Sequence, residues 1–281
     1  MNFFIITKKQ ILIFFSLLLT FVFFASFYYI SAHSNNSLFC YKETTFCVSS
    51  LSNLKDNASS DIQEKIDSIY SSNEKIAYLT FDDGPTKVAT PKVLDILKKE
   101  NVKATFFVIG YRVEEFPDTV KRAYEEGHFI ANHTYSHKNA KLYQSKESFL
   151  KEINQANSAI SKAIGISSYS PHLFRFPNGS KGTSYSGAKK RCLEYLKEIN
   201  YAYVDWNALN NDSIHKYTSS ELLNNLKNSC KNKDSIVVLM HDTADVSRSY
   251  LALQDSIKYL KEQGYTFKTF EDLLSLKEEN H

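Results

Sequence analysis

From Glu74 onward, short apolar runs alternate with longer segments whose apolar positions recur at helical spacing. The short runs predict strands at Ile76–Phe81, Ala104–Ile109, Phe129–Asn132, Leu173–Phe176, Tyr201–Asp205, Ser235–Met240 and Thr266–Phe267. The longer segments predict helices at Pro91–Glu100, Pro117–Glu126, Lys146–Ile164, Gly187–Ile199, Ser219–Lys231 and Ser247–Gln263. Repeated strand–helix–strand order predicts an α/β fold built on a parallel sheet, either open or closed into a barrel.

The first 30 residues follow a different pattern. No charged residue occurs between Lys9 and Lys42, and the segment Ile11–Ile30 is almost wholly apolar. As a helix with about 1.5 Å rise per residue, this segment reaches roughly 30 Å, the thickness of the hydrocarbon core of a bilayer. We therefore expect residues 1–30 to form a cytoplasmic tip and a single transmembrane anchor, with the rest of the chain extracytoplasmic. A cleaved signal peptide, which would release a secreted protein, is the alternative.

Residues 31–73 are rich in Ser and Asn and predict an extracytoplasmic stalk. One amphipathic stretch, at Ile62, Ile66 and Ile69, predicts a helix against the following domain, which we place at residues 74–281. The four cysteines are divided between these regions, Cys40 and Cys47 in the stalk and Cys192 and Cys230 in the domain. Outside a membrane, pairing within each region is the simplest of three connectivities, and four unpaired thiols are the alternative.

Composition narrows the possible functions. The chain is 43% hydrophobic and 23% charged, which excludes a wholly disordered protein. Its net charge of +3 is too small to indicate a dedicated nucleic-acid binder. The cysteine spacings contain no CxxC pair, so any metal must be held by other residue types. Residues 182–189 resemble a P-loop but lack a preceding strand and a correctly placed Lys, so we expect no nucleotide partner.

Polar residues follow the predicted strands, where chemistry collects in parallel α/β folds. They are Asp82, Asp83, His133, His137, Arg175, Asp205, Asp212, His241 and Asp242. The turn after Asp83 lets two adjacent carboxylates leave their strand in different directions, so that one can bind a cation while the other stays free as a base. The spacing of His133 and His137 predicts two imidazoles on one face of a helical turn. One carboxylate with two histidines suits a catalytic zinc site with an open position, or a non-haem iron site.

Four motifs then point to one family. They are TFDDGP at 80–85, HTYSH at 133–137, RFPNGS at 175–180 and LMHD at 239–242, and they resemble those of the polysaccharide deacetylase domain (NodB-like, carbohydrate esterase family 4) over about residues 74–275. The resemblance implies a distorted (β/α) barrel and a divalent metal ion, zinc first and cobalt or another ion as alternatives. It implies Asp82 as the catalytic base and Asp83, His133 and His137 as metal ligands. It further implies that Arg175 orients Asp82, that Pro177 and Leu239 line the substrate site, and that His241 is the general acid.

One segment departs from the family pattern. In VDWNALNNDS at 204–213, Leu209 stands where an acidic residue is frequent and Ser213 where a Trp is frequent. Asp212 is our first choice for the carboxylate that tunes His241, and Asp205 is the second. The family uses a backbone N–H near Tyr135 to stabilise the oxyanion, which makes Tyr135 a further candidate. Aromatic side chains such as Tyr111, Tyr135 and Trp206 are candidates for stacking on sugar rings.

Together these features give a functional hypothesis. The chain resembles membrane-anchored peptidoglycan N-acetylglucosamine deacetylases, and an enzyme tethered outside a membrane meets the wall of its own cell first. We therefore predict a metal-dependent hydrolase that removes N-acetyl groups from an acetylated cell-wall glycan. An O-acetyl esterase acting on xylan or another glycan is the first alternative, and a wall-binding module without catalysis is the second.

Overall fold

A single parallel sheet forms the centre of the protein in the computed structural model, which describes residues 62–243 and 248–274. The strand order is β5-β4-β3-β2-β1-β7-β6, with β8 paired to β1. The strands are β1 Ile76–Asp82, β2 Thr105–Val108, β3 Phe129–Asn132, β4 Leu173–Phe174, β5 Ala202–Tyr203, β6 Ala208–Leu209, β7 Ser235–His241 and β8 Thr266–Phe267. Every residue of β1 is buried, as expected for a central parallel strand covered on both faces.

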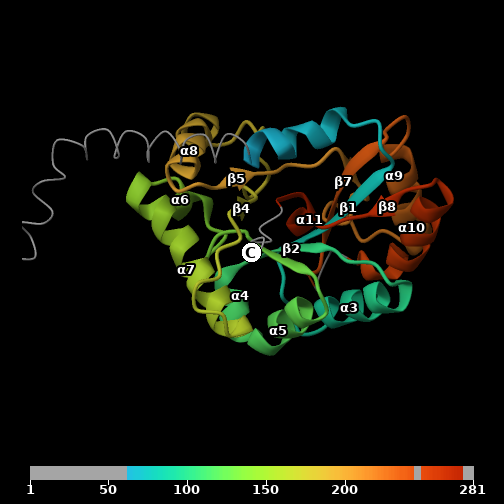
Figure 1. Ribbon diagram of the computed structural model, residues 1–281, viewed down its shortest axis with the longest axis horizontal. Coiled ribbons are helices and arrows are strands. Elements are labelled where there is room, and N and C mark those ends of the chain that lie inside the picture. Colours follow the sequence, from blue (N-terminus) through green and yellow to red (C-terminus); the bar gives the residue numbers. More distant parts are fainter. Residues whose placement is uncertain (1–61, 244–247, 275–281) are drawn as a thin grey trace, which may run out of the picture. The chain divides into compact units, whose positions relative to one another are not determined.

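Helices surround these strands (Figure 1). They are α3 Ala89–Glu100, α4 Gly110–Glu115, α5 Pro117–Glu125, α6 Asn139–Leu142, α7 Lys146–Ile164, α8 Ser186–Glu198, α9 Ser219–Ser229, α10 Tyr250–Glu262 and α11 Phe270–Leu274. Local signals explain several of their ends. Pro117 occupies the first turn of α5, where a missing N–H costs nothing. Thr218 and Glu221 form a capping box on α9, and Gly165 ends α7 in the left-handed conformation.

The predicted alternation of strands and helices is confirmed, and β3, β8 and α7 coincide with their predicted bounds. Four elements were not predicted: β6, α4, α6 and α11. They have two to six residues, too few to show a period of 2 or 3.6 in the sequence. Strands β4 and β5 are also shorter than predicted, with two residues each.

The sheet curves into an incomplete barrel, because no hydrogen-bonded pairing joins β5 to β6 within the described part of the chain. Residues 62–68 are helical and continue into the 3₁₀ turn η1 (Ile69–Ser71), and this segment packs along the open edge. The Gln63 side chain donates to the Tyr203 carbonyl (3.2 Å) and accepts from the Tyr203 N–H (3.0 Å). Ile66 and Ile69 are buried in a cluster with Tyr78 and Val237. The predicted amphipathic helix therefore protects an otherwise unpaired strand edge.

The predicted disulfide between Cys192 and Cys230 is wrong. Both residues are free, buried thiols that belong to different hydrophobic clusters. Each behaves as a small apolar side chain, and burial raises the pKa of Cys230 to about 11. Cys40 and Cys47 lie outside the described residues.

Within residues 62–243 and 248–274, no helix combines the length and the apolar content needed to cross a bilayer. The predicted anchor at Ile11–Ile30 and most of the predicted stalk lie outside the described residues.

Candidate active site

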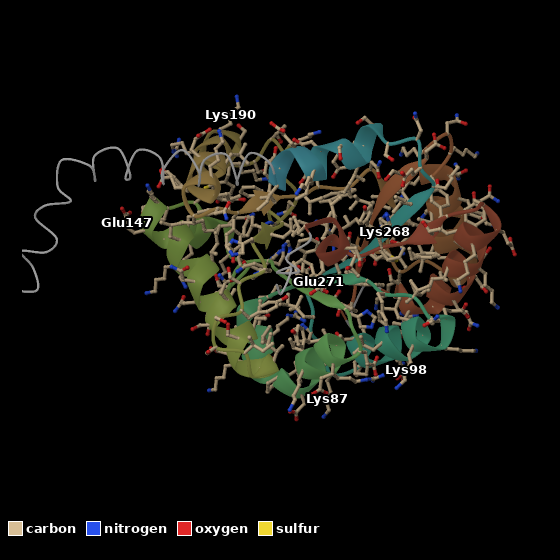
Figure 2. All side chains as sticks on the ribbon, viewed as in Figure 1. Lys87, Lys98, Glu147, Lys190, Lys268 and Glu271 are labelled. Atoms are coloured by element: carbon tan, nitrogen blue, oxygen red, sulfur yellow. The ribbon has the colours of Figure 1, made fainter. Side chains whose placement is uncertain are left out.

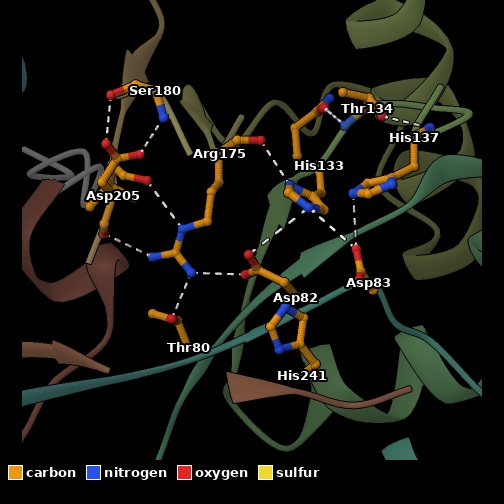
Figure 3. A network of polar contacts seen from close by, with 12 residues as sticks. Thr80, Asp82, Asp83, His133, Thr134, His137, Arg175, Ser180, Asp205 and His241 are labelled. Carbon is orange, nitrogen blue, oxygen red and sulfur yellow. Dashed lines mark hydrogen bonds and ion pairs between the residues drawn. The ribbon is translucent and has the colours of Figure 1, made fainter. Parts of the chain in front are cut away.

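The paired carboxylates diverge at the end of β1, as predicted. Asp82 is the last residue of the strand, with His241 of β7 beside it in the register. Asp83 adopts a positive φ of 72°, a conformation that Asp tolerates better than most residues. This turn directs the Asp82 carboxylate toward Arg175 and the Asp83 carboxylate toward the two histidines, as Figure 3 shows. The unusual backbone conformation of Asp83 therefore gives the carboxylates of Asp82 and Asp83 different surroundings.

Three donor atoms converge beside β1. Asp83 Oδ1 lies 3.4 Å from His133 Nε2 and 3.2 Å from His137 Nε2, and all three atoms lie within 4.8 Å of one another. Asp83 Oδ1 is buried and accepts no hydrogen bond, which is costly unless a cation completes its environment. His133 Nδ1 lies 2.8 Å from the Arg175 carbonyl, which can only accept, so the ring's Nε2 lone pair faces the cluster. These observations fit a divalent metal site.

The charges of the cluster suit metal binding. Burial raises the pKa of Asp83, but the neighbouring imidazoles of His133 and His137 outweigh burial and hold that pKa well below its usual range. Burial and the neighbouring His133 lower the pKa of His137. Burial lowers the pKa of His133, but the charges of Asp82 and Asp83 outweigh burial and raise it. Because an ionised carboxylate and neutral imidazoles are the forms that bind a metal, binding here would displace a proton from His133.

The backbone of the HxxxH segment differs from the prediction. His133 and His137 do not share a helical turn, because Thr134 and His137 have φ values of 70° and 55°. The loop is held by the Asn132 side chain, which accepts from the Thr134 N–H (2.9 Å), and by the Thr134 hydroxyl, which accepts from the His137 N–H (2.9 Å). The imidazoles still meet, with ring centroids 5.0 Å apart. Convergence here comes from a loop and not from helical spacing.

Arg175 holds the carboxylate of Asp82 from the protein interior. Its guanidinium is fully buried and donates to the Asp82 carboxylate (2.8 Å) and the Thr80 hydroxyl (2.7 Å). It also donates to the carbonyls of Val204 (3.1 Å) and Asp205 (3.2 Å). A buried charge needs such partners, and together they hold the Asp82 carboxylate in one orientation.

His241 is bound by Asp212. The Asp212 carboxylate lies 2.7 Å from His241 Nδ1 and accepts from the His241 N–H at 2.7 Å, and it also accepts from the Ser249 hydroxyl. Burial lowers the pKa of His241, but the hydrogen bond and charge of Asp212 outweigh burial and raise it to about 9. The Asp205 carboxylate instead accepts from the N–H (2.8 Å) and hydroxyl (2.5 Å) of Ser180. Asp212 is therefore the partner of His241, and the second choice, Asp205, is not.

The backbone near Tyr135 leaves one amide free. The N–H groups of Thr134, Ser136 and His137 each donate to a side chain, and that of Ser136 reaches the buried Glu152 carboxylate at 2.7 Å. Within the described residues, the Tyr135 N–H has no acceptor. Its side-chain hydroxyl donates to Glu114 (2.8 Å). This unpaired N–H, between His133 and His137 in the chain, is available to an oxyanion.

Comparison with known proteins agrees with this geometry. The family model for polysaccharide deacetylase matches residues 70–204. A peptidoglycan-N-acetylglucosamine deacetylase of Bacillus cereus is 37% identical over 201 residues, which are 70% of each chain. The chain belongs to the polysaccharide deacetylase family. Peptidoglycan-N-acetylmuramic acid deacetylase PdaA of Bacillus subtilis is 35% identical over 76% of this chain and 78% of its own length. The crystal structure of the catalytic domain of peptidoglycan N-acetylglucosamine deacetylase from Eubacterium rectale superposes with a TM-score of 0.63 at 32% identity, covering 69% of this chain and 88% of that one.

In this polysaccharide deacetylase the three predicted substrate-site residues lie on three separate segments. Pro177 is buried in the loop after Arg175, and Leu239 lies in β7 beside Thr80 of β1. Trp206 lines a cavity of about 280 Å³ with Tyr70 and other residues, and none of the three candidate metal ligands lines that cavity. The Trp206 ring lies 5.8 Å from the Arg175 guanidinium. The cavity that it lines is therefore separate from the cluster of Asp83, His133 and His137.

Sequence reasoning missed several residues that support this site. Ser249 and Asn210 extend the hydrogen-bond network of Asp212, but Ser and Asn are too common for their chemistry to identify them. Asp242 was among the polar residues predicted at the strand ends, but the sequence assigned it no role. Its buried carboxylate accepts from the Thr90 hydroxyl (2.6 Å), and burial raises its pKa to about 7. Its backbone N–H donates to the Asp82 carbonyl (3.3 Å). Asp242 therefore supports the loop that carries Asp83.

Proposed function

We propose that the chain is a metal-dependent hydrolase that removes N-acetyl groups from a cell-wall glycan, with peptidoglycan as the first candidate. The observation that carries this proposal is the convergence of Asp83, His133 and His137 beside a second carboxylate, Asp82, with a protonated His241 next to it in the sheet. Relatives named as peptidoglycan deacetylases support the choice of polymer.

Asp83, His133 and His137 would hold the metal ion, zinc or another divalent cation. Three protein donors leave a coordination position open, as in catalytic zinc sites. A divalent ion bound there supplies Lewis-acid polarisation of the acetyl carbonyl and acidifies water in its vicinity.

The chain's own residues account for the proton transfers. An amide resists hydrolysis because its nitrogen is a poor leaving group, so a base for water and an acid for nitrogen are both needed. Arg175 binds one oxygen of Asp82, and the other oxygen lies 3.9 Å from His133 Nε2, at the metal cluster. Asp82 is placed to take the proton of the attacking water. His241, protonated at neutral pH, is placed to donate a proton to the departing nitrogen, and the Tyr135 N–H is free to stabilise the oxyanion.

We also propose that Ile11–Ile30 anchors the enzyme as a single membrane span, with the catalytic domain extracytoplasmic. The length and apolarity of that segment support the proposal. Cell fractionation tests it: full-length protein in the membrane fraction is expected. A shortened protein in the culture medium would instead indicate cleavage and secretion.

Metal removal tests the proposed function. We expect acetate release from purified peptidoglycan to cease in a chelator and to return on addition of zinc or cobalt. Assays on an N-acetylated and an O-acetylated oligosaccharide of equal length should show preference for the amide. Activity that persists after the metal has been removed would refute the metal-dependent mechanism. Preference for the ester would favour an esterase, and tight glycan binding without acetate release would favour a binding module.

A further inference from the structure

A second cavity lies beside the metal-binding loop. It has a volume of about 480 Å³ and is lined by Tyr111, Tyr135, Ser136, Lys138 and Lys141. Three of these residues, Tyr135, Ser136 and Lys138, belong to the loop segment that also carries His133 and His137, although neither histidine lines the cavity itself. The Tyr111 N–H donates to the Tyr135 carbonyl (3.0 Å), which fixes the two aromatic residues relative to each other.

The charges around this cavity are unequal. Lys141 is paired with the buried Glu152 (2.8 Å) and lies 6.0 Å from the centre of the Tyr135 ring. The Glu114 carboxylate accepts the hydrogen bond of the Tyr135 hydroxyl. In the described part of the chain, Lys138 has no ion-pair partner, and it directly follows His137. Lys138 therefore supplies an ammonium group that forms no ion pair within the described part of the chain, while Glu114 supplies a carboxylate at the Tyr135 hydroxyl.

Arg112 adds to this charge. Its Nε donates to the Tyr111 hydroxyl at 3.0 Å, and its guanidinium lies 5.7 Å from the Tyr111 ring centre. No carboxylate pairs with Arg112 among the described residues. The two tyrosine rings thus offer apolar faces that end in hydroxyl groups, and the cationic side chains of Lys138 and Arg112 lie beside them.

We propose that this cavity is a subsite for an acidic substituent of the glycan, occupied when the neighbouring N-acetyl group lies at the metal cluster. The inference rests on the proposed function and adds the substrate class: a glycan whose sugars carry carboxylates. A sugar ring fits against Tyr111 and Tyr135, and Lys138 attracts the carboxylate. The carboxylate can come from the lactyl ether of muramic acid or from the peptide attached to it. Neutral glycans such as chitin or xylan gain nothing from Lys138, so this residue contributes to discrimination between substrates.

Substitution of Lys138 tests the subsite. The substrates are a peptide-free oligosaccharide of alternating N-acetylglucosamine and N-acetylmuramic acid, and a neutral N-acetylglucosamine oligomer of equal length. Lys138→Gln should lower kcat/KM on the acidic substrate by about fivefold, the size expected of a partly exposed ion pair. Lys138→Glu should lower it further, because it adds repulsion. On the neutral oligomer, the kcat/KM of both variants should stay within twofold of that of the parent protein.

Lys190→Gln is the matched control. Lys190 is an exposed residue of α8, labelled in Figure 2, and does not line the cavity. The Lys190→Gln variant should have the same kcat/KM as the parent protein on both substrates. An equal effect of the Lys138 variants on acidic and neutral substrates would overturn the subsite while leaving deacetylation intact. If the parent protein releases acetate from neither substrate, the proposed function itself fails.

The source of the carboxylate is resolved by a third substrate, the same glycan carrying its peptides. In that glycan the lactyl carboxyl is an amide, so its carboxylates belong to the peptide. If the Lys138 effect is larger on the peptide-free glycan, the lactyl group is the ligand. If it is larger on the peptide-bearing glycan, the peptide is the ligand. No Lys138 effect on either would overturn the proposal.

Discussion

Asp82 and Asp83 are neighbours in the chain and have different environments. Asp82 is hydrogen-bonded to a buried guanidinium, whereas Asp83 faces two imidazoles with an oxygen that accepts no hydrogen bond. The positive φ of Asp83 causes the difference, because it turns one carboxylate away from the other. Two identical side chains can therefore serve as base and metal ligand.

The pKa of His241 leads to a prediction about pH. A general acid must be protonated, so kcat/KM should fall as pH rises through the pKa of His241, about 9. Asp212→Asn removes the charge that raises this pKa but leaves the burial that lowers it. The alkaline limb of the kcat/KM profile should therefore move to lower pH by at least about one unit, which corresponds to ~1.4 kcal/mol.

The control for that prediction is Asp95→Asn, which removes an exposed carboxylate paired with Arg122 on the surface. Its profile should match that of the parent. An alkaline limb that does not move in Asp212→Asn would show that His241 is not the group being titrated.

At the residue scale, the sequence was informative where residue type limits chemistry. Asp83, His133 and His137 were predicted as a set from the resemblance of the TFDDGP and HTYSH motifs to the family, and their donor atoms do converge. Ser249 was not predicted, since it reaches Asp212 from a distant part of the chain and only the fold brings them together. The failed pairing of Cys192 with Cys230 has the same origin, because sequence does not show that two thiols enter different clusters.

At the element scale, the loop after β1 is built by contacts between β1, β7 and α3. The Thr86 hydroxyl donates to the Asp242 carbonyl (2.8 Å), and Thr90 donates to the Asp242 carboxylate. A side chain on Gly84 would meet that carboxylate, because a Cβ atom there would lie 2.2 Å from Asp242 Oδ2. The absence of a side chain at Gly84 is therefore required for the loop to close over Asp242.

Gly84→Ala should consequently be destabilising. Overpacking of this kind costs about 1–3 kcal/mol, and the displaced loop carries Asp83, so zinc affinity should fall as well. Urea unfolding and calorimetric zinc titration measure the two effects.

Gly187→Ala in α8 is the comparison, because a Cβ atom there would meet only Arg191 at 4.0 Å. It should be neutral or stabilising by up to about 1 kcal/mol. Equal stability and equal zinc affinity for Gly84→Ala and the parent would contradict the packing that we describe.

Long elements were predictable and short ones were not. Helix α7 has 19 residues with buried positions at helical spacing, so its bounds could be read from the sequence. Strand β6 has two residues within the polar segment 205–213, and it is defined by pairing with β7 and not by its own pattern. The helical turn predicted for HTYSH was wrong because hydrogen bonds from Asn132 and Thr134 stabilise a loop with positive φ values in its place.

For the whole molecule, the open side of the barrel is closed by residues that precede the first strand. Ile66 is fully buried, and Gln63 satisfies both polar backbone groups of Tyr203. This segment therefore takes the place that a pairing between β5 and β6 would fill.

Ile66→Ala should cost about 2–5 kcal/mol of unfolding free energy, as removal of a buried Ile side chain does. Chemical denaturation of the full chain measures this cost. Ile214→Ala is the control, because Ile214 is 56% exposed and its substitution should change stability by no more than about 0.5 kcal/mol. Equal stability of the two variants would mean that residues 62–71 do not contribute to the core.

The most direct test of the central claim is mass spectrometry of muropeptides after peptidoglycan has been incubated with the full chain or with its Asp82→Asn variant. We predict N-deacetylated muropeptides from the parent, and a rate lower by about 10²–10⁴-fold in the variant, the range that a general base contributes. The variant should still bind zinc, because Asp82 is not among the three convergent donors. Fully acetylated muropeptides after incubation with the zinc-loaded parent, or equal rates for the two proteins, would contradict the account.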